Sequence, residues 1–252
     1  ENHLLEIRLN ELNKYVDYFI IIEFGQTHQG TAKPKNIDTK ILNKFSGKIR
    51  YYFVEQFESI EEPHGRDQFQ RNYVLKGLFD AQSNDIIIIS DIDEIPDLRN
   101  FDLKKVNKEI VAFSQSHSMY KLNLLLKEKW IGSKLCKFKK LKSPQWLRSL
   151  RVNKKYSFLR IDKLFSTRYS RNVKIIQNGG WHFGWLRDTS SIIKKLEAYA
   201  HSEHNNEYYK NKNLLDKCIK EQKNFFNTNE TLKVANLNEL PEYIQKNYNK
   251  YK

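Results

Sequence analysis

Apolar side chains near the start of the chain recur at helical spacing. They are Leu5, Leu9, Leu12 and Val16. This period predicts an amphipathic helix over 3–14. The run over 16–23 is β-branched and aromatic without alternation, which is typical of a strand covered on both faces. We expect that strand to end at Glu23, where a polar loop begins.

Helices and strands are expected to alternate in the first third of the chain. The pattern predicts strands over 49–55 and 85–91, with a helix over 66–82 between them. The buried face of that helix would be formed by Phe69, Tyr73, Leu78 and Phe79. Strands that alternate with helices favour a mostly parallel sheet covered by helices on both sides. Such sheets bind ligands at the carboxyl ends of their strands, where Glu23 and Asp91 lie.

The pattern loosens in the rest of the chain. Short strands are expected over 110–113, 119–125 and 173–177, and a helix from Thr189 or Ser190 to about 201 precedes two further helices. The basic, aromatic stretch over 129–157 has no clear period, and 178–185 is interpreted as a turn-rich aromatic loop. With no internal repeat in view, we expect one α/β domain with a helical C-terminal region.

The composition indicates which class of protein this is but does not identify its ligand or activity. Hydrophobic residues are 39% and aromatic residues 13% of the chain, which is typical of a folded globular protein. The net charge of +14 favours anionic partners, although a solvated basic surface explains it equally well. Cys136 and Cys218 are too few for a disulfide framework, so a reducing compartment is expected. No stretch approaches the roughly 20 apolar residues of a membrane span.

Three acids follow the most apolar predicted strand, in the segment Asp91-Ile92-Asp93-Glu94. Strand residues two apart point the same way, so the carboxylates of Asp91 and Asp93 are expected to converge on one cation. Such oxygen ligands suit Mg²⁺ or Mn²⁺ held together with substrate phosphates. A polar turn that ends the strand is the alternative, but the consecutive isoleucines before it favour a metal site. A glycoside hydrolase is disfavoured. Its two carboxylates stand roughly 5–10 Å apart on opposite sides of a sugar, whereas Asp91 and Asp93 are expected to lie closer together and to point the same way.

Other candidate residues lie in the glycine- and aromatic-rich run over 179–185 and on the helix before the metal strand. Trp181 and Trp185 could stack on a sugar face. His182 could complete the metal shell or hydrogen-bond a phosphate, although a structural histidine is the commoner case. Arg71 suits a diphosphate or an acid at the strand end. The sequence has no P-loop, Gly-x-Ser-x-Gly or paired-cysteine motif, so those enzyme classes lose support.

In the order of its motifs the chain resembles glycosyltransferase family 17, whose eukaryotic member adds the bisecting N-acetylglucosamine to the core mannose of N-glycans. The specific parts of the resemblance are 90–96, which contains Ser-Asp-Ile-Asp-Glu-Ile-Pro, and 179–183, which contains Gly-Gly-Trp-His-Phe. The segments 1–12, 16–23 and 241–248 support it. The stretches 129–157 and 184–188 differ from the animal enzyme, so the acceptor need not be the same.

The resemblance implies a single GT-A-type domain over 1–252. Residues from about 1 to 100 would bind the nucleotide-sugar, and residues from about 101 to 252 would bind the acceptor and supply the C-terminal helices. The donor would be a UDP-sugar, with N-acetylglucosamine the favoured sugar, and the acceptor a glycan hydroxyl. The resemblance further implies a divalent cation, Mn²⁺ or Mg²⁺, and inversion at the anomeric carbon.

Site residues follow from the same resemblance. Asp91 and Asp93 would engage the metal and the donor diphosphate, with His182 as a further metal ligand. Glu23 would face the nucleoside, and Arg71 and Trp181 would contact the donor. One carboxylate must deprotonate the acceptor hydroxyl. Asp188 is the first candidate for this base and Glu94 the second.

Two other classes of function fit the same residues. One is a metal-dependent nucleotidyl- or phosphotransferase, because paired acids also serve chemistry at phosphorus. The other is a non-catalytic basic protein that binds nucleic acid or an anionic surface. We favour the glycosyltransferase and expect no specific nucleic-acid partner. We expect a cytoplasmic location, with peripheral attachment to an anionic membrane; the Golgi lumen is the alternative if an N-terminal anchor has been removed.

Overall fold

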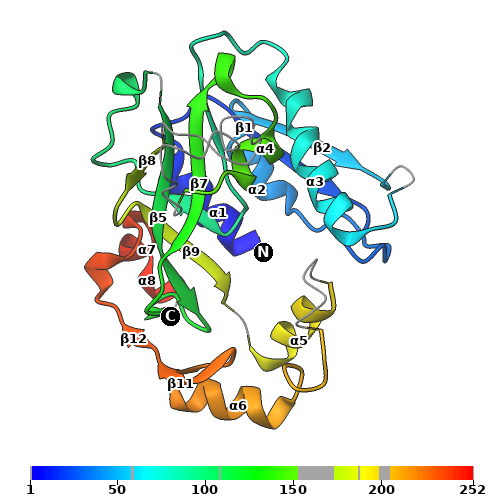
Figure 1. The fold of residues 1–252 in the computed structure, drawn as a ribbon, viewed down its shortest axis with the longest axis vertical. Coiled ribbons are helices and arrows are strands. Elements are labelled where there is room, and N and C mark those ends of the chain that lie inside the picture. Colours follow the sequence, from blue (N-terminus) through cyan, green and yellow to red (C-terminus); the bar gives the residue numbers. More distant parts are fainter. Residues whose placement is uncertain are drawn as a thin grey trace, which may run out of the picture.

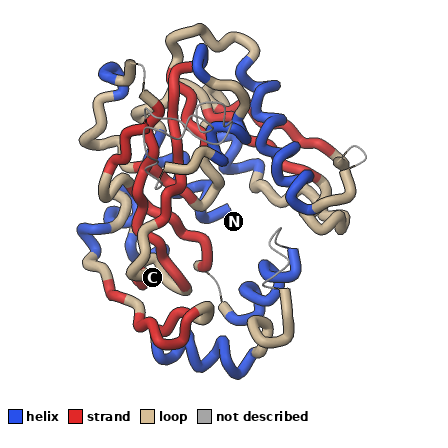
Figure 2. Tube along the Cα trace, viewed as in Figure 1, coloured by secondary structure: helices blue, strands red, loops and turns tan. Residues whose placement is uncertain are grey.

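Long strands run through the middle of the molecule, and helices lie beside them and at one end, as the computed structural model shows (Figures 1 and 2). The structure describes residues 2–57, 60–107, 109–152, 173–186, 188–198 and 205–251. Within these residues the strands form one eight-stranded sheet and two two-stranded sheets. The larger sheet and the parallel pair β1–β2 together place the candidate site.

The first part of the chain forms the parallel pair and its helices. The elements are α1 (Asn2–Leu12), β1 (Phe19–Phe24), α2 (Thr39–Lys44), β2 (Ile49–Val54) and α3 (Pro63–Tyr73), which continues as a 3₁₀ helix (Val74–Leu78). Phe19 lies opposite Ile49 in the parallel register of β1 and β2. Parallel neighbours need a long crossover, and the loop with α2 supplies it. The predicted helix over 3–14 and the predicted strands over 16–23 and 49–55 are thus confirmed to within a few residues.

The predicted burial of Phe79 is wrong. Its side chain is 75% exposed, and its ring lies 4.6 Å from the guanidinium of Arg50. A continuous α-helix over 66–82 would have placed it on the buried face. The helix instead tightens to 3₁₀ geometry after Tyr73. The tighter turn has about three residues instead of 3.6, so the residues beyond it rotate away from that face.

The eight-stranded sheet is mostly antiparallel, so the prediction of a mostly parallel sheet is wrong. Its strands are β3 (Ile86–Ile89), β4 (Glu94–Pro96), β5 (Ile110–Met119), β6 (Leu124–Leu125), β7 (Trp130–Lys137), β8 (Val173–Ile176), β9 (Gly180–Trp185) and β12 (Lys233–Val234). β7 runs antiparallel to both β3 and β5, whereas β8 and β9 run parallel to β5. The strand–helix alternation of the first part of the chain ends at β3. Beyond it, short connections such as that between β5 and β6 allow antiparallel pairing without a crossover helix.

Three predictions of strand positions are wrong. The strand predicted over 110–113 extends to Met119 as β5, because the polar residues Ser114, Gln115 and Ser118 are buried in it. A turn at Tyr120, with a φ of 64°, then ends the strand that was expected over 119–125. The stretch over 129–157, which showed no clear period, contains β7. The strand was not predicted because two of its polar residues, Ser133 and Lys134, are buried between β3 and β5 and break the alternation.

The segment predicted as an aromatic loop over 178–185 is the buried strand β9. All six of its residues are buried, and it pairs with β4 on one side and β5 on the other. Gly180 has a φ of 130°, and a Cβ there would lie 2.1 Å from the carbonyl oxygen of Ile95. Glycine is therefore required at this position by both backbone conformation and space.

The C-terminal part contains strands as well as the predicted helices. Its elements are α4 (Pro144–Ser149), α5 (Thr189–Ala198), α6 (Lys212–Glu221), β10 (Lys223–Asn224), β11 (Asn227–Thr231), α7 (Glu242–Lys246) and α8 (Tyr248–Tyr251). Further 3₁₀ turns span Leu103–Lys105, Phe138–Lys140 and Leu237–Glu239. The predicted end of a helix near 201 and the residues 153–157 lie outside the described residues. None of the described helices is long and apolar enough to cross a membrane.

Three hydrophobic clusters fix the elements that carry the candidate site. The largest joins α1 to β4, β5, β9 and α7, with Ile7, Ile95 and Phe183 fully buried. Another joins β3 and β7 to α4, where Leu147 is fully buried. The third joins α5 and α6 to the end of β5, where Ile192, Leu196 and Leu215 are fully buried. α5 and α6 lie together at one end of the molecule (Figure 1), and their cluster holds α5 at the carboxyl end of β9.

Candidate functional site

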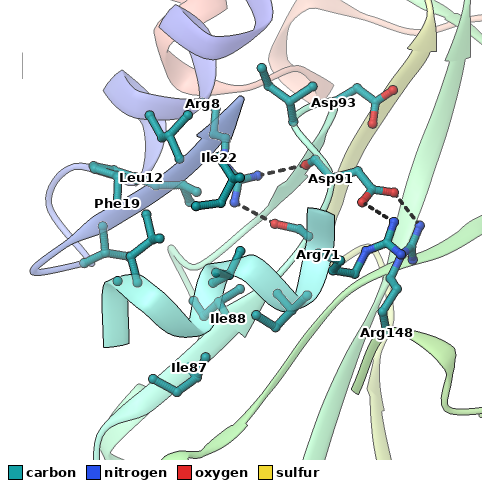
Figure 3. Close-up of a pocket in the computed structure, with 18 of the residues that line it drawn as sticks. Arg8, Leu12, Phe19, Ile22, Arg71, Ile87, Ile88, Asp91, Asp93 and Arg148 are labelled. Carbon is teal, nitrogen blue, oxygen red and sulfur yellow. Dashed lines mark hydrogen bonds and ion pairs between the residues drawn. The ribbon is translucent and has the colours of Figure 1, made fainter. Parts of the chain in front are cut away.

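A cavity of about 1830 Å³ extends from the β1–β2 pair to the turn that follows β3. One part of its lining is apolar and comes from α1, β1 and β3; Leu12, Phe19, Ile22, Ile87 and Ile88 lie there (Figure 3). The other part is charged. Its side chains include Arg71, Asp91, Asp93, Arg148 and Lys195. We call these five residues the charged end of the cavity.

Asp91 is held by two arginines from different helices (Figure 3). Arg71 of α3 donates to its Oδ1 at 3.1 Å, and Arg148 of α4 donates to its Oδ2 at 2.8 Å. Burial by itself would raise the pKa of Asp91, but the charges of the two arginines outweigh that effect and hold the pKa below its ordinary value. Asp91 is therefore a carboxylate that fixes the positions of two guanidinium groups.

Asp93 contacts a different set of side chains. Nε2 of His182 lies 3.6 Å from its Oδ1, and Nζ of Lys195 lies 3.5 Å from its Oδ2. The pairing of β4 with β9 brings His182 beside this segment, since Glu94 lies opposite His182 and the amide of Phe183 donates to the Asp93 carbonyl at 2.8 Å. Burial raises the pKa of Asp93, but His182 and the charge of Lys195 bring it well below its ordinary value.

Asp91 and Asp93 thus face different partners, although a continuing strand would have pointed both the same way. The reason is a turn. The amide of Glu94 donates to the carbonyl of Asp91 at 3.1 Å, so the chain leaves the extended conformation directly after β3. The period-two argument applies only within a strand.

Glu94 is fully buried beneath this turn. Its Oε1 accepts from Nε1 of Trp130 at 2.6 Å and from Arg148 at 2.7 Å, and its Oε2 accepts from the Asp91 amide at 3.2 Å. Burial raises the pKa of Glu94, and the neighbouring charge of Asp91 adds to that shift. Its side chain does not line the cavity. Glu94 therefore links β7 and α4 to the turn over residues 91–94, which we call the acidic turn.

Arg8 of α1 holds the same turn from the opposite side, and sequence reasoning missed it. Its guanidinium donates to the carbonyl of Asp91 at 3.4 Å (Figure 3). It also donates to the carbonyl of Glu94 and to the hydroxyl of Ser90 at 2.6 Å. A signal was available. Arg8 lies three residues after Leu5 and four before Leu12, so it falls on the apolar stripe of its helix.

Three rings form a stacked wall beside Asp93. The ring of His182 lies 4.4 Å from that of His117 and 4.8 Å from that of Trp130. Burial and then His182 lower the pKa of His117 to about 3, so this imidazole is neutral near pH 7. Within the described residues, Nε2 of His117 and Nδ1 of His182 are buried without a hydrogen-bond partner. Nothing in the sequence indicated that His117 belongs to the site, because the polar run over 114–118 does not show the alternation of a strand.

Three other predicted site residues have partners outside the charged end. Glu23 lines the cavity, but its carboxylate already accepts from the amide of Asn36 at 2.6 Å and from the hydroxyl of Tyr51 at 2.8 Å. Trp181 lies in the main core, where its Nε1 donates to the carbonyl of Glu239 at 2.7 Å. Asp188 is exposed at the start of α5, where it accepts from the amide of Ser191 at 2.8 Å. The roles assigned to these residues stay predictions.

Asp93 at the charged end and the adjacent His182 offer two neighbouring donors for a divalent cation. They are the carboxylate of Asp93 and the imidazole of His182, whose second ring nitrogen is buried and unpartnered. Among the described residues no group of three or more His, Cys, Asp or Glu side chains is arranged to hold a metal ion. Magnesium is commonly bound by one or two carboxylates together with substrate phosphates and water. The pair therefore fits a cation whose remaining ligands come from a phosphate-bearing substrate.

Comparison with known protein families gives a match that covers the whole chain. The sequence model of a family described as Glycosyltransferase family 17 matches residues 1–252. No curated protein and no solved structure matches the chain. The match includes the acidic turn over 91–94 and the helices α3, α4 and α5, which together carry the five residues of the charged end.

Proposed function

The chain belongs to glycosyltransferase family 17, and we propose that it transfers a sugar, preferably N-acetylglucosamine, from a UDP-sugar to a hydroxyl of a glycan acceptor with inversion. The observation that carries this proposal is the charged end of the cavity. There, two acids and three basic side chains gather at one end of a space of about 1830 Å³. A nucleotide-sugar is a long ligand with a charged centre, and this lining combines a large apolar part with a charged part.

The donor diphosphate is proposed to lie at the charged end. Arg71 and Arg148 are kept in place by Asp91, so their guanidinium groups need little reorganisation when a phosphate arrives. Preorganised cations of this kind favour the nucleoside diphosphate as it departs with its growing negative charge. The apolar lining from β1 and β3 would receive the uncharged parts of the donor.

The cation is proposed to be Mn²⁺ or Mg²⁺ and to be held by Asp93 and His182. When bound, it would act as a Lewis acid that offsets charge on the leaving diphosphate. The stacked rings of His117, Trp130 and His182 would exclude water from this side of the site and orient the imidazole of His182 toward Asp93.

Of the two predicted bases we retain Asp188. Inversion requires one carboxylate that takes the proton of the attacking hydroxyl while the sugar leaves the diphosphate. Glu94 is fully buried and engaged by Trp130 and Arg148, so an acceptor could not reach it without breaking these contacts. Asp188 is exposed and begins α5, the helix that carries Lys195 into the cavity.

Family membership supports the glycosyltransferase over the two other classes of function. The acids and basic side chains of the cavity would also suit a nucleotidyl- or phosphotransferase, but the family model that matches the chain is that of a glycosyltransferase. A GT-A-type architecture stays part of the proposal, with a mostly antiparallel main sheet. The net charge of +14 supports a further proposal, that the enzyme associates with anionic membrane surfaces while it modifies glycans.

Thermal denaturation with nucleotides and nucleotide-sugars, with and without Mn²⁺, tests the proposed function. At a ligand concentration of about 100 times Kd, stabilisation is about 2.7 kcal/mol, which raises the Tm of a domain of this size by roughly 5–10 °C. We expect that shift with UDP and Mn²⁺, and release of free UDP when a glycan acceptor is added to the matching UDP-sugar.

The matched variants are Asp93→Asn and Asp102→Asn. Both remove one carboxylate charge, but Asp102 lies outside the cavity lining. The first should abolish the shift and the second should keep it. Release of pyrophosphate or transfer of a phosphate, with no sugar transferred, would contradict the proposal and support the phosphotransferase.

A further inference from the structure

Lys195 reaches the charged end of the cavity from α5, and neither the sequence nor the family resemblance pointed to it. Its side chain is 18% exposed. Its ammonium donates to the carbonyl of Gly184 at 2.5 Å and lies 3.5 Å from Oδ2 of Asp93 and 5.1 Å from the ring centre of Trp185. Ile192 and Leu196 on the same helix are fully buried, so the helix is fixed while Lys195 projects into the cavity.

The ties that hold Lys195 are weaker than those that hold the two arginines. Arg71 donates to Asp67, Asp91 and Gln145, and Arg148 donates to Asp91, Glu94 and the carbonyl of Gly132. Lys195 has one carboxylate neighbour, at 3.5 Å, within the described residues. An ammonium has three N–H donors on a flexible stem, and among the described residues one of them makes a hydrogen bond, to the carbonyl of Gly184. Of the three basic side chains at the charged end, Lys195 can therefore change partner with the smallest loss of interactions.

Lys195 and a divalent cation would compete for the same carboxylate. Asp93 and His182 offer the donors for a cation, and Asp93 is also the acid that Lys195 neutralises. With the ammonium beside Asp93, a cation would meet a carboxylate whose charge is already balanced. If the ammonium moved to a diphosphate, Asp93 would become available to the cation. Binding of the diphosphate and of the cation would then favour each other.

We propose that Lys195 is an exchangeable cation of the donor site. Without donor it neutralises Asp93, and with donor it binds the diphosphate and leaves Asp93 to the divalent cation. This inference rests on the proposed function, because it takes the ligand to be a nucleoside diphosphate. It adds an order of events: the cation binds weakly to the free protein and more tightly once the diphosphate is present.

Calorimetric titrations of the full chain with Mn²⁺ alone, and with UDP in the presence of a chelator, test the exchange. In the Lys195→Met variant we expect Mn²⁺ to bind at least about tenfold more tightly than in the wild type, since the competing charge is gone. We expect metal-free UDP to bind at least about tenfold more weakly, since one charged contact to phosphate is lost. Lys195→Arg should keep the affinity for metal-free UDP within about threefold, because it keeps the charge.

The matched control is Lys217→Met on α6, which removes the same charge from an exposed position in the neighbouring helix. It should leave both affinities unchanged. If Lys195→Met fails to fold, Lys195→Gln gives the same two predictions. Wild-type-like affinities for Mn²⁺ and UDP in folded Lys195→Met or Lys195→Gln would overturn the inference and leave the proposed function standing. A wild-type chain that binds no UDP even with Mn²⁺ would instead overturn the proposed function.

Discussion

Replacing Arg148 by methionine should destabilise the fold strongly, because it leaves a fully buried carboxylate without its cation. The guanidinium of Arg148 lies 2.7 Å from Oε1 of Glu94 and 2.8 Å from Oδ2 of Asp91. Glu94 is 0% exposed, whereas 39% of the Asp91 side chain is exposed and Arg71 still contacts it. Water therefore screens the loss at Asp91, and most of the effect comes from Glu94. Removing one partner of a buried pair costs about 3–5 kcal/mol, and we expect a loss of about 3 kcal/mol.

Urea unfolding at pH 7.5, followed by far-UV circular dichroism, measures this loss. The double variant Arg148→Met with Glu94→Gln should recover about 1 kcal/mol or more, because no unpaired charge remains buried. The deficit of the single variant should shrink from pH 8 to pH 5. The pKa of Glu94 is already raised, so its carboxyl takes up a proton as the pH falls and the unpaired charge disappears. Lys246→Met breaks an exposed ion pair with Glu242 and should cost about 0.5 kcal/mol or less. A single variant within 1 kcal/mol of the wild type at pH 7.5 would refute this reasoning about the buried pair.

Three further predictions concern the stacked rings of His117, Trp130 and His182, the strand β9 and the proposed base. His117 has its pKa lowered to about 3, so the unfolded chain binds a proton below about pH 6.5 that the folded chain refuses. Between pH 6 and pH 4 the wild type should therefore lose about 2 kcal/mol more stability than the His117→Gln variant, and equal losses would contradict the assigned burial. Gly180→Ala should cost at least about 2 kcal/mol, since its Cβ would lie 2.1 Å from the carbonyl oxygen of Ile95, whereas Gly47→Ala, with nothing within 4 Å, should stay within about 0.5 kcal/mol. Asp188→Asn should retain the helix cap and UDP binding but slow sugar transfer by about 10²–10⁴-fold, and an undiminished rate would remove Asp188 as the base.

Much of the first part of the fold was predictable because its elements are uniform in pattern. The stripe of Leu5, Leu9 and Leu12 defines α1, and uninterrupted apolar runs define β1 and β3. The sheet as a whole was not predictable from those elements. Strand direction depends on how the later strands connect, and those strands carry buried polar residues such as Gln115 and Lys134 that break the alternation.

Polar burial also explains what was missed at the site. Lys134 is 3% exposed, and its ammonium donates to the carbonyl of Leu150 at 2.9 Å, where it holds the end of α4 behind Arg148. Burial, together with the charge of Arg148, lowers its pKa to about 8. A sequence pattern that equates charge with exposure cannot find such a residue. It likewise cannot show that Arg148 and Lys195, far apart in the sequence, lie beside two acids separated by one residue.

The acidic motif was correctly located at the end of a buried strand, but its geometry needed the structure. The prediction that Asp91 and Asp93 share one cation assumed an extended chain, whereas the turn closed by the Glu94 amide sends one acid to two arginines and the other to His182 and Lys195. The short motif alone does not distinguish these arrangements, because they differ only in the backbone conformation of residues 91–94.

Calorimetric titration of UDP into the wild type and the Asp93→Asn variant, each with saturating Mn²⁺, tests the central claim most directly. The claim is that the charged end of the cavity is the donor site of a glycosyltransferase. We predict that the wild type binds UDP and that Asp93→Asn, still folded by circular dichroism, binds it at least about 100-fold more weakly, since it loses the carboxylate that would hold the cation. Equal UDP affinities in the two folded proteins would contradict the claim.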